Sequence, residues 1–267
     1  MLLRHEAVNN LALRIISRFA DGTRPLPCDA YLAVAFAADP ADHADADIVG
    51  VALRTPPYPF ALGYPSGAAL PALLADALAF AAPAALPGVI GEAREATAFA
   101  VAHGAFTGTG YRQVLALRAH VLTQVETVPS RGELRSATAA ELPLLTEWTR
   151  AFQAEALPHD PPAQAPALDG LWIWWSGGAP VTMLRMQPFS PTSVAISLVY
   201  TPPDLRRRGY ATAAVAAASA RALADGRTSC ALFTDLANPT SNAIYARIGY
   251  RPIADFLNLA FTPERAT

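Results

Sequence analysis

Short apolar runs alternate with amphipathic stretches along the second half of the chain, and their order predicts an α/β protein. Runs with the length of strands lie at 134–137, 171–175, 179–187, 194–200, 230–234 and 256–261. Two of these runs flank Ser176-Gly177-Gly178, a sequence typical of a hairpin turn. Apolar residues with helical spacing lie at 139–156, 211–224 and 239–248. The last of these helices begins with Pro239 and precedes Gly249, as helix termini favour.

The first half of the chain shows a similar order of elements. We expect helices at 8–19, 68–80 and 93–103, strands at 30–37, 48–54, 88–91 and 113–125, and a glycine-containing loop at 104–110. The shared order indicates two related domains, residues 1–129 and 130–267. The alternative is one domain with a long N-terminal extension.

The composition is that of a folded protein with little net charge. Of its 267 residues 52% are hydrophobic and 16% are charged, and the formal net charge is −2. Such a chain can bury a full core, and it offers no general attraction to nucleic acid or to an acidic membrane surface. No segment has the ~20 apolar residues of a membrane span, and the N-terminus lacks the apolar run of a signal peptide. Cys28 and Cys230 are far apart and the histidines lack metal-ligand spacing, so we expect a cytoplasmic protein without a metal.

A basic turn that contains a glycine precedes the predicted helix at 211–224. Its sequence is Arg206-Arg207-Arg208-Gly209-Tyr210-Ala211, directly after the apolar run at 194–200 and Thr201-Pro202-Pro203. Gly209 lets the main chain approach a ligand closely, and Ala211 keeps the first helical turn free of bulk. Main-chain N–H groups at a helix N-terminus bind anions, and arginines add permanent positive charge. The turn therefore predicts a phosphate site, with a solvated surface turn as the alternative.

Two motifs together resemble the GNAT N-acetyltransferase superfamily. The spacing Arg-x-x-Gly-x-Ala at 206–211 is similar to the family's pyrophosphate loop for acyl-CoA. Further along, Asn238, Tyr245, Gly249 and Tyr250 follow the family's pattern of an asparagine, a tyrosine seven residues later, a glycine and an aromatic residue. The resemblance covers residues 131–262. It implies an α/β (α+β) fold with a mixed, mostly antiparallel twisted sheet flanked by helices, here in tandem.

The resemblance also implies a binding path for acetyl-CoA as co-substrate. The pantetheine arm would pair with exposed main-chain groups of Val199–Thr201, where the family's strands splay apart. Asn238, which also has the ordinary interpretation of a helix N-cap, would hold this arm. The residues expected to bind acetyl-CoA are Val199, Tyr200, Thr201, Arg206, Arg207, Arg208, Gly209, Tyr210, Ala211, Thr212 and Asn238.

Tyr245 is the expected proton donor to the leaving thiolate, because the family's tyrosine at this spacing lies beside the CoA sulfur. A phenol with an ordinary pKa near 10 is protonated at neutral pH; the alternative is an aromatic that only packs on the sheet. The strand at 194–200 lacks the glutamate base of many family members, which leaves Ser197 to position a water. Glu155 and Trp174 are candidates for acceptor binding, with a solvated helix end and core packing as their alternatives.

These expectations combine into an acyltransferase. Residues 130–267 would move an acetyl group from acetyl-CoA to a primary amine of a small molecule or peptide. Residues 1–129 would form a degenerate GNAT-like domain without the cofactor loop, since Gly63 to Ala69 in the counterpart position contains no arginine. The missing strand carboxylate leaves a second hypothesis open, a non-catalytic acyl-CoA-binding regulatory protein.

Overall fold

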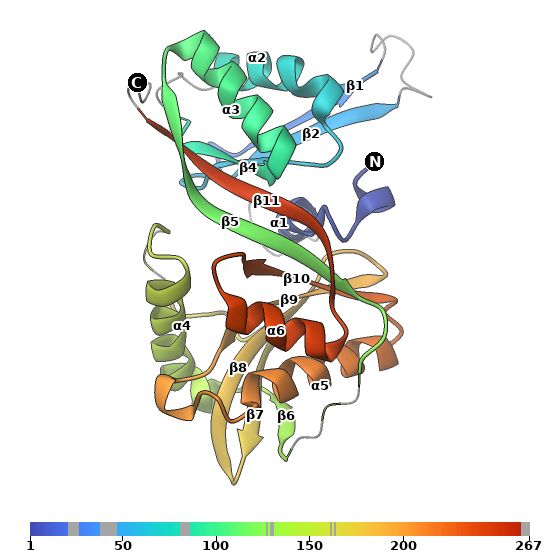
Figure 1. Cartoon of the computed structure of the whole chain (residues 1–267), viewed down its shortest axis with the longest axis vertical. Coiled ribbons are helices and arrows are strands. Elements are labelled where there is room, and N and C mark those ends of the chain that lie inside the picture. The colour runs from blue at the N-terminus through green and yellow to red at the C-terminus, as the bar shows by residue number, and fades with distance from the viewer. Residues whose placement is uncertain are drawn as a thin grey trace. The chain divides into compact units, whose positions relative to one another are not determined.

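The computed structural model describes residues 1–20, 27–37, 47–80, 86–126, 128, 131–160, 162 and 164–262, and these form two compact units (Figure 1). The first unit contains Met1–Ala119, Asp235–Ala237 and the chain from Ile253 onward. The second unit contains His120–Thr234 and Asn238–Pro252. Each unit therefore includes chain from both halves of the sequence. The expected domain boundary between residues 129 and 130 lies outside the described residues.

The second unit is built on the sheet order β10-β9-β8-β7-β6. Its elements are β6 (Glu133–Ser136), α4 (Leu142–Ala156), β7 (Leu171–Ser176), β8 (Ala179–Pro188), β9 (Ser193–Tyr200), α5 (Tyr210–Ala224), β10 (Ser229–Asp235) and α6 (Pro239–Ile248). Neighbouring strands are antiparallel except β9 and β10, which are parallel. A parallel pair needs a crossover connection, which α5 provides.

Both faces of this sheet are covered by helices. One core cluster joins Val194 and Ile196 of β9 to the alanine-rich face of α5 and to Ile248 of α6. The other joins Ile173 and Met183 to Leu145 and Trp148 of α4. The tryptophans of β7 are divided between the two faces: Trp172 and Trp174 contact the first cluster and Trp175 contacts the second, because successive side chains of a strand point to opposite faces.

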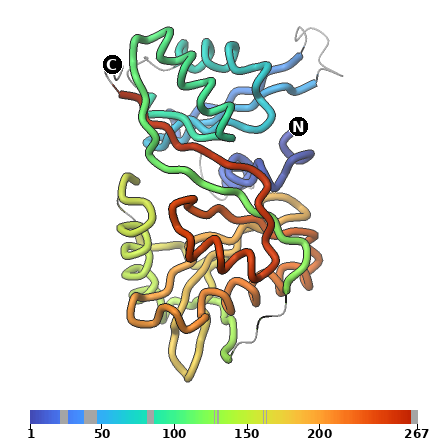
Figure 2. The backbone as a smooth tube through the Cα atoms, viewed as in Figure 1, coloured from blue at the N-terminus to red at the C-terminus, as the bar shows by residue number. Residues whose placement is uncertain are grey.

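The first unit has the sheet order β1-β2-β3-β4-β11-β5. Its elements are α1 (Asn10–Ala20), β1 (Tyr31–Phe36), β2 (Ile48–Arg54), β3 (Phe60–Leu62), α2 (Leu70–Phe80), β4 (Gly88–Glu92), α3 (Ala93–Thr107), β5 (Gly110–Leu122) and β11 (Arg251–Thr262). One cluster packs α2 and α3 against the sheet through Leu73 and Phe99, and a smaller one packs α1 through Ala12. Figure 2 traces β5 and β11 side by side in this unit, where Arg118 and Asp255 form an ion pair of 2.7 Å.

The expected fold class is confirmed: a mixed, mostly antiparallel sheet flanked by helices. Two local predictions were wrong. The stretch 104–110 is not a loop, because α3 continues to Thr107 and ends at Gly108, which has a left-handed φ of 78°. Position 104 inside this helix favours glycine, because a Cβ there would lie 2.6 Å from the Thr109 carbonyl oxygen. Strand β3 was missed since its length of three residues gives no recognisable period. Among the described residues, no helix is both long and apolar enough to cross a bilayer.

Candidate active site

Strands β9 and β10 separate along their length. They pair in parallel register only at Ser193, Val194 and Ala195 of β9, which face Ser229, Cys230 and Ala231 of β10. Both strands continue beyond these pairs, to Tyr200 and Asp235 respectively. Over this continuation, β9 stays paired with β8 on its other side. The edge of β9 that faces β10 is therefore open at its C-terminal end.

A β-bulge lies where β9 leaves its parallel partner. Leu198 has a φ of 54°, the left-handed region that non-glycine residues rarely occupy, and the register with β8 shifts between Met183 and Arg185. Bulges bend a strand and are frequent beside active sites. The Leu198 bulge accounts for the divergence of β9 from β10.

The turn between β9 and α5 presents a row of main-chain donors. Arg207 and Gly209 have φ values of 63° and 82°, so the chain reverses twice before α5 begins. Gly209 is the N-cap of α5, and no side chain caps this end of the helix. Among the described residues, no acceptor binds the N–H groups from Arg207 to Thr212. The next N–H group, that of Ala213, donates to the Gly209 carbonyl. Unpaired N–H groups at the positive end of a helix dipole form an anion site.

The three arginines of this turn differ in what they contact. Arg206 donates to both carboxylate oxygens of Glu155, at 2.9 and 2.7 Å, and to the carbonyl of Thr201 at 2.9 Å. Its guanidinium also lies 5.6 Å from the centre of the Tyr200 ring. Arg208 donates to the Asp204 carbonyl at 3.0 Å. The Arg207 side chain makes no hydrogen bond or ion pair with any described residue, which leaves it available to a ligand.

The ion pair between Arg206 and Glu155 joins the turn to the end of α4. The acetyl-CoA contact expected of Arg206 and the acceptor contact expected of Glu155 stay predictions, and either contact would have to form beside this ion pair. Thr212 is buried, so it can offer a ligand little beyond its main-chain N–H group, whereas Tyr210 is partly buried against the core cluster of α5.

Tyr245 lies on the buried face of α6. It is 8% exposed, and its ring meets Tyr250 edge-on with 5.9 Å between centroids. Burial raises the pKa of Tyr245 to about 12. Its hydroxyl has no hydrogen-bond partner among the described residues, whereas the Tyr250 hydroxyl pairs with Ser219 Oγ at 2.8 Å. Tyr245 thus holds its proton at neutral pH and has it free to donate.

The N-terminus of α6 is fixed by two asparagines. Asn238 Oδ1 accepts from the Ser241 N–H at 3.0 Å and so caps the helix, while Asn238 Nδ2 has no partner among the described residues. Asn242, in the first turns of α6, accepts from Thr234 Oγ1 of β10 at 2.6 Å and donates to the Asn238 carbonyl at 2.9 Å. This pair of contacts holds the helix that carries Tyr245 against β10.

The remaining predicted residues lie in different surroundings. Ser197 is partly exposed on β9, next to the Leu198 bulge and opposite Arg185 of β8. Trp174 is 3% exposed and belongs to the core between the sheet and α5. A substrate could reach Trp174 only by displacing that core.

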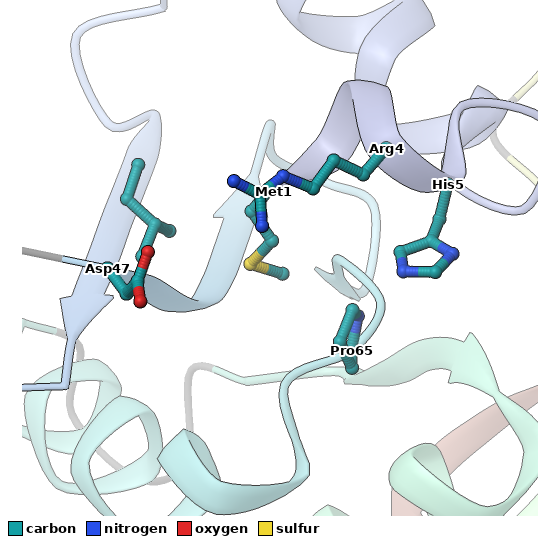
Figure 3. Close-up of a pocket in the computed structure, with 6 residues that line it drawn as sticks. Met1, Arg4, His5, Asp47 and Pro65 are labelled. Carbon is teal, nitrogen blue, oxygen red and sulfur yellow. The ribbon is translucent and has the colours of Figure 1, made fainter.

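The structure also contains a pocket of about 280 Å³ in the first unit (Figure 3). It is lined by Met1, Arg4, His5, Asp47, Ile48 and Pro65, none of which the sequence marked as functional. No group of three or more His, Cys, Asp or Glu side chains that could hold a metal occurs within the part of the chain that the structure describes.

Residues 139–250 match the sequence profile of the family described as Acetyltransferase (GNAT) family. No curated protein sequence matches the chain. A Drosophila protein of known structure aligns over 97% of this chain and 90% of its own, with a TM-score of 0.64 and 13% identity.

Two bacterial structures are similar over comparable lengths. A GCN5-related N-acetyltransferase from Kribbella flavida covers 93% of this chain and 95% of its own, with a TM-score of 0.58 and 21% identity. A GCN5-related N-acetyltransferase from Sphaerobacter thermophilus covers 89% of this chain and 96% of its own, with a TM-score of 0.53 and 14% identity. At these identities the likeness concerns the fold, which is shared along nearly the whole chain. The match shows that residues 139–250 are an acetyltransferase domain of the GNAT family, so the chain carries the domain of an acyltransferase.

Proposed function

We propose that the second unit transfers the acetyl group of acetyl-CoA to a primary amine of a small molecule or peptide. The observation that carries this proposal is the row of unbonded N–H groups from Arg207 to Thr212, placed directly after a strand whose edge is open. A diphosphate and an amide-containing arm are the two parts of CoA that such a turn and such an edge can bind.

Each part of the donor has a place along this path. The diphosphate accepts hydrogen bonds from the N–H groups of the turn and pairs with the Arg207 guanidinium. The pantetheine amides pair with the main chain of Val199 and Tyr200, as an added strand would. The free Nδ2 of Asn238 donates to a pantetheine carbonyl. The carbonyl of Thr201, which the sequence also marked, already accepts from Arg206.

The chemistry then needs two proton movements. The neutral amine attacks the thioester carbon, the N–C bond forms and the C–S bond breaks. Tyr245 donates its proton toward the departing sulfur, so that the products are an amide and free CoA thiol. The surplus proton on the amine nitrogen passes to a water held by Ser197, because β9 carries no carboxylate. Tyr245 recovers a proton from solvent at the end of the cycle.

A binding measurement tests the assignment of the turn. Replacing Arg207→Ala together with Gly209→Glu puts a negative charge into the cradle, and acetyl-CoA affinity measured by calorimetry should fall below detection. Arg251→Ala, an exposed arginine outside the turn, serves as the matched control and should bind normally. Unchanged affinity in the double variant would contradict the assignment.

Thiol release separates catalysis from the regulatory alternative. With a panel of primary amines, an acetyltransferase produces free CoA thiol at a rate that depends on the amine. Acetyl-CoA binding without thiol production from any amine of the panel would favour a non-catalytic acyl-CoA-binding regulatory protein. We also propose a cytoplasmic location, which both unpaired cysteines, Cys28 and Cys230, support.

We further propose that residues 1–129 are a degenerate GNAT-like domain and 130–267 the acetyltransferase domain. The series β1-β2-β3-α2-β4-α3-β5 has the same element order as β7-β8-β9-α5-β10-α6-β11. In both series three antiparallel strands lead through a helix to a parallel fourth strand. The first series would then act as a scaffold.

A further inference from the structure

The turn between β3 and α2 of the first unit occupies the position in the element order that the turn before α5 occupies in the second. It follows the third strand of an antiparallel set and leads through a helix to β4, which pairs in parallel with β3 at Phe60↔Val89 and Ala61↔Ile90. A turn in this position is the counterpart of the proposed diphosphate cradle.

In the first unit four N–H donors of this turn are already bonded, those of Ser66, Gly67, Ala69 and Leu70. Glu95, in the first turn of α3, accepts from the N–H of Ser66 at 2.8 Å and from that of Gly67 at 3.0 Å through the same oxygen, Oε1. The N–H of Ala69 binds the Ser66 carbonyl at 2.9 Å, and that of Leu70 binds the Gly67 carbonyl. The corresponding N–H groups before α5 have no partner within the described residues. The chain supplies its own carboxylate at the position where the second unit offers bare donors.

The space beside the strand is closed as well. A methyl group placed on Gly91 of β4 would lie 3.0 Å from Leu62 Cβ of β3, so these strands do not diverge at their C-terminal ends. A methyl group on Gly63 would lie 2.8 Å from Leu2 Cδ2, because that leucine covers the beginning of the turn. Ala61 is paired on both sides, with Leu53 of β2 and Ile90 of β4. Within the described residues, β3 thus offers a pantetheine arm no open main-chain edge at Ala61.

The electrostatics agree with this closure. Glu95 is 9% exposed, and its Oε2 atom is buried without a hydrogen-bond partner in the described structure. Burial raises the pKa of Glu95 above its ordinary value, and the hydrogen bonds from Ser66 and Gly67 offset part of this rise. An external diphosphate would have to displace this carboxylate or lie against it, and either arrangement is unfavourable.

From these contacts we infer that Glu95 is a built-in substitute for the cofactor phosphate in the first unit, so that each chain binds one acetyl-CoA, in the second unit alone. The inference rests on the proposed function only for the identity of the ligand. The filled state of the β3–α2 turn is independent of it.

Binding stoichiometry gives the first test. Calorimetry with acetyl-CoA should give one site per wild-type chain and none in the Arg207→Ala, Gly209→Glu variant. Two sites in the wild type, or one remaining site in the variant, would overturn the inference. If the wild type bound no acetyl-CoA, the proposed function would fail, and the second test would still decide the inference.

The second test vacates the turn. Glu95→Ala removes the internal acceptor, whereas Glu95→Gln keeps an oxygen that can accept from the same N–H groups and is the matched control. Inorganic sulfate at matched ionic strength should raise the Tm of Glu95→Ala by about 3 °C more than that of Glu95→Gln, through binding to the freed donors. The general salting effect of sulfate is common to both variants and cancels. Equal Tm gains would overturn the inference, and the stoichiometry test remains decisive if Glu95→Ala does not fold.

Discussion

Replacing Tyr245 by phenylalanine removes a single oxygen and separates catalysis from packing. The ring is 8% exposed, and phenylalanine fills the same space. Because the hydroxyl has no hydrogen-bond partner among the described residues, its loss should change the free energy of unfolding by no more than about 0.5 kcal/mol. Any large loss of activity would then come from the chemistry.

The expected loss of kcat can be worked out from the pKa values of Tyr245 and of the CoA thiol. A positioned general acid contributes about 10²–10⁴-fold, or roughly 3–5 kcal/mol of barrier. Burial raises the pKa of Tyr245 to about 12, whereas an ordinary thiol has a pKa of about 8.5. Complete transfer to the thiolate is therefore uphill by roughly 5 kcal/mol, at 1.36 kcal/mol per pKa unit. Tyr245 shares its proton with the sulfur as charge develops, and we expect a loss near the lower limit, about 100-fold in kcat.

The assay follows free thiol released from acetyl-CoA, with the most active amine of the panel. Single-turnover rates are compared as well, because product release can conceal a slower chemical step. The KM for acetyl-CoA should stay within a few-fold of wild type. Deprotonation of Tyr245 should not lower the activity below about pH 11, since burial raises the pKa of Tyr245 to about 12.

Tyr250→Phe is the control for this change. Its hydroxyl pairs with Ser219 Oγ, so its removal should cost about 1 kcal/mol of stability and leave kcat unaltered. If Tyr245→Phe kept wild-type single-turnover rates, Tyr245 would be a packing residue and the proton would come from elsewhere.

Three further changes test the turn and the first unit. Arg206→Ala should raise the KM for acetyl-CoA about tenfold by releasing the turn from Glu155, with a stability change below about 1 kcal/mol because the ion pair is half exposed. Arg206→Lys should not restore the KM, since lysine has one nitrogen and cannot bind Glu155 and the Thr201 carbonyl as Nη2 and Nε of Arg206 do. An unaltered KM would show that the pair does not position the turn. Gly209→Ala should cost about 1–2 kcal/mol in urea unfolding, from its φ of 82° alone, because an added Cβ meets no atom within 4 Å; no loss would contradict a left-handed turn. Burial lowers the pKa of His103 in the folded state, so the unfolded state binds the proton more tightly, and stability should fall as pH drops below about 6.5 and level off once both states are protonated. Urea titrations across this pH range should show that the free energy of unfolding falls in the wild type and falls less in His103→Gln. An equal dependence on pH in both proteins would show that other groups cause the fall.

Local signals made the second unit predictable. Pro239 and Gly249 bracket α6 as the structure has it, and Gly209 marks the left-handed residue before α5. These features depend on residues close in sequence, whose conformational preferences act within one turn. The apolar runs of β7 to β10 were found for the same reason, since alternation is visible within a single strand.

The contacts that shape the candidate site join residues far apart in the sequence, so no local pattern in the sequence predicts them. The ion pair of Arg206 with Glu155 joins positions on the turn and at the end of α4, and neither sequence neighbourhood predicts the other. The Leu198 bulge is visible only through the register with β8, because leucine normally favours regular strand or helix. The pairing of Thr234 with Asn242 likewise requires knowing that α6 packs on β10.

The distribution of β11 has a consequence for any attempt to produce the two halves separately. A fragment that starts near residue 130 would carry β11 without β4, to which Phe256–Ala260 are paired, and it would lack His120–Leu122 of β5. A fragment that stops there would expose the edge of β4 to solvent and to other chains. The two fragments should therefore assemble into a complex when they are co-expressed, whereas each fragment alone should aggregate.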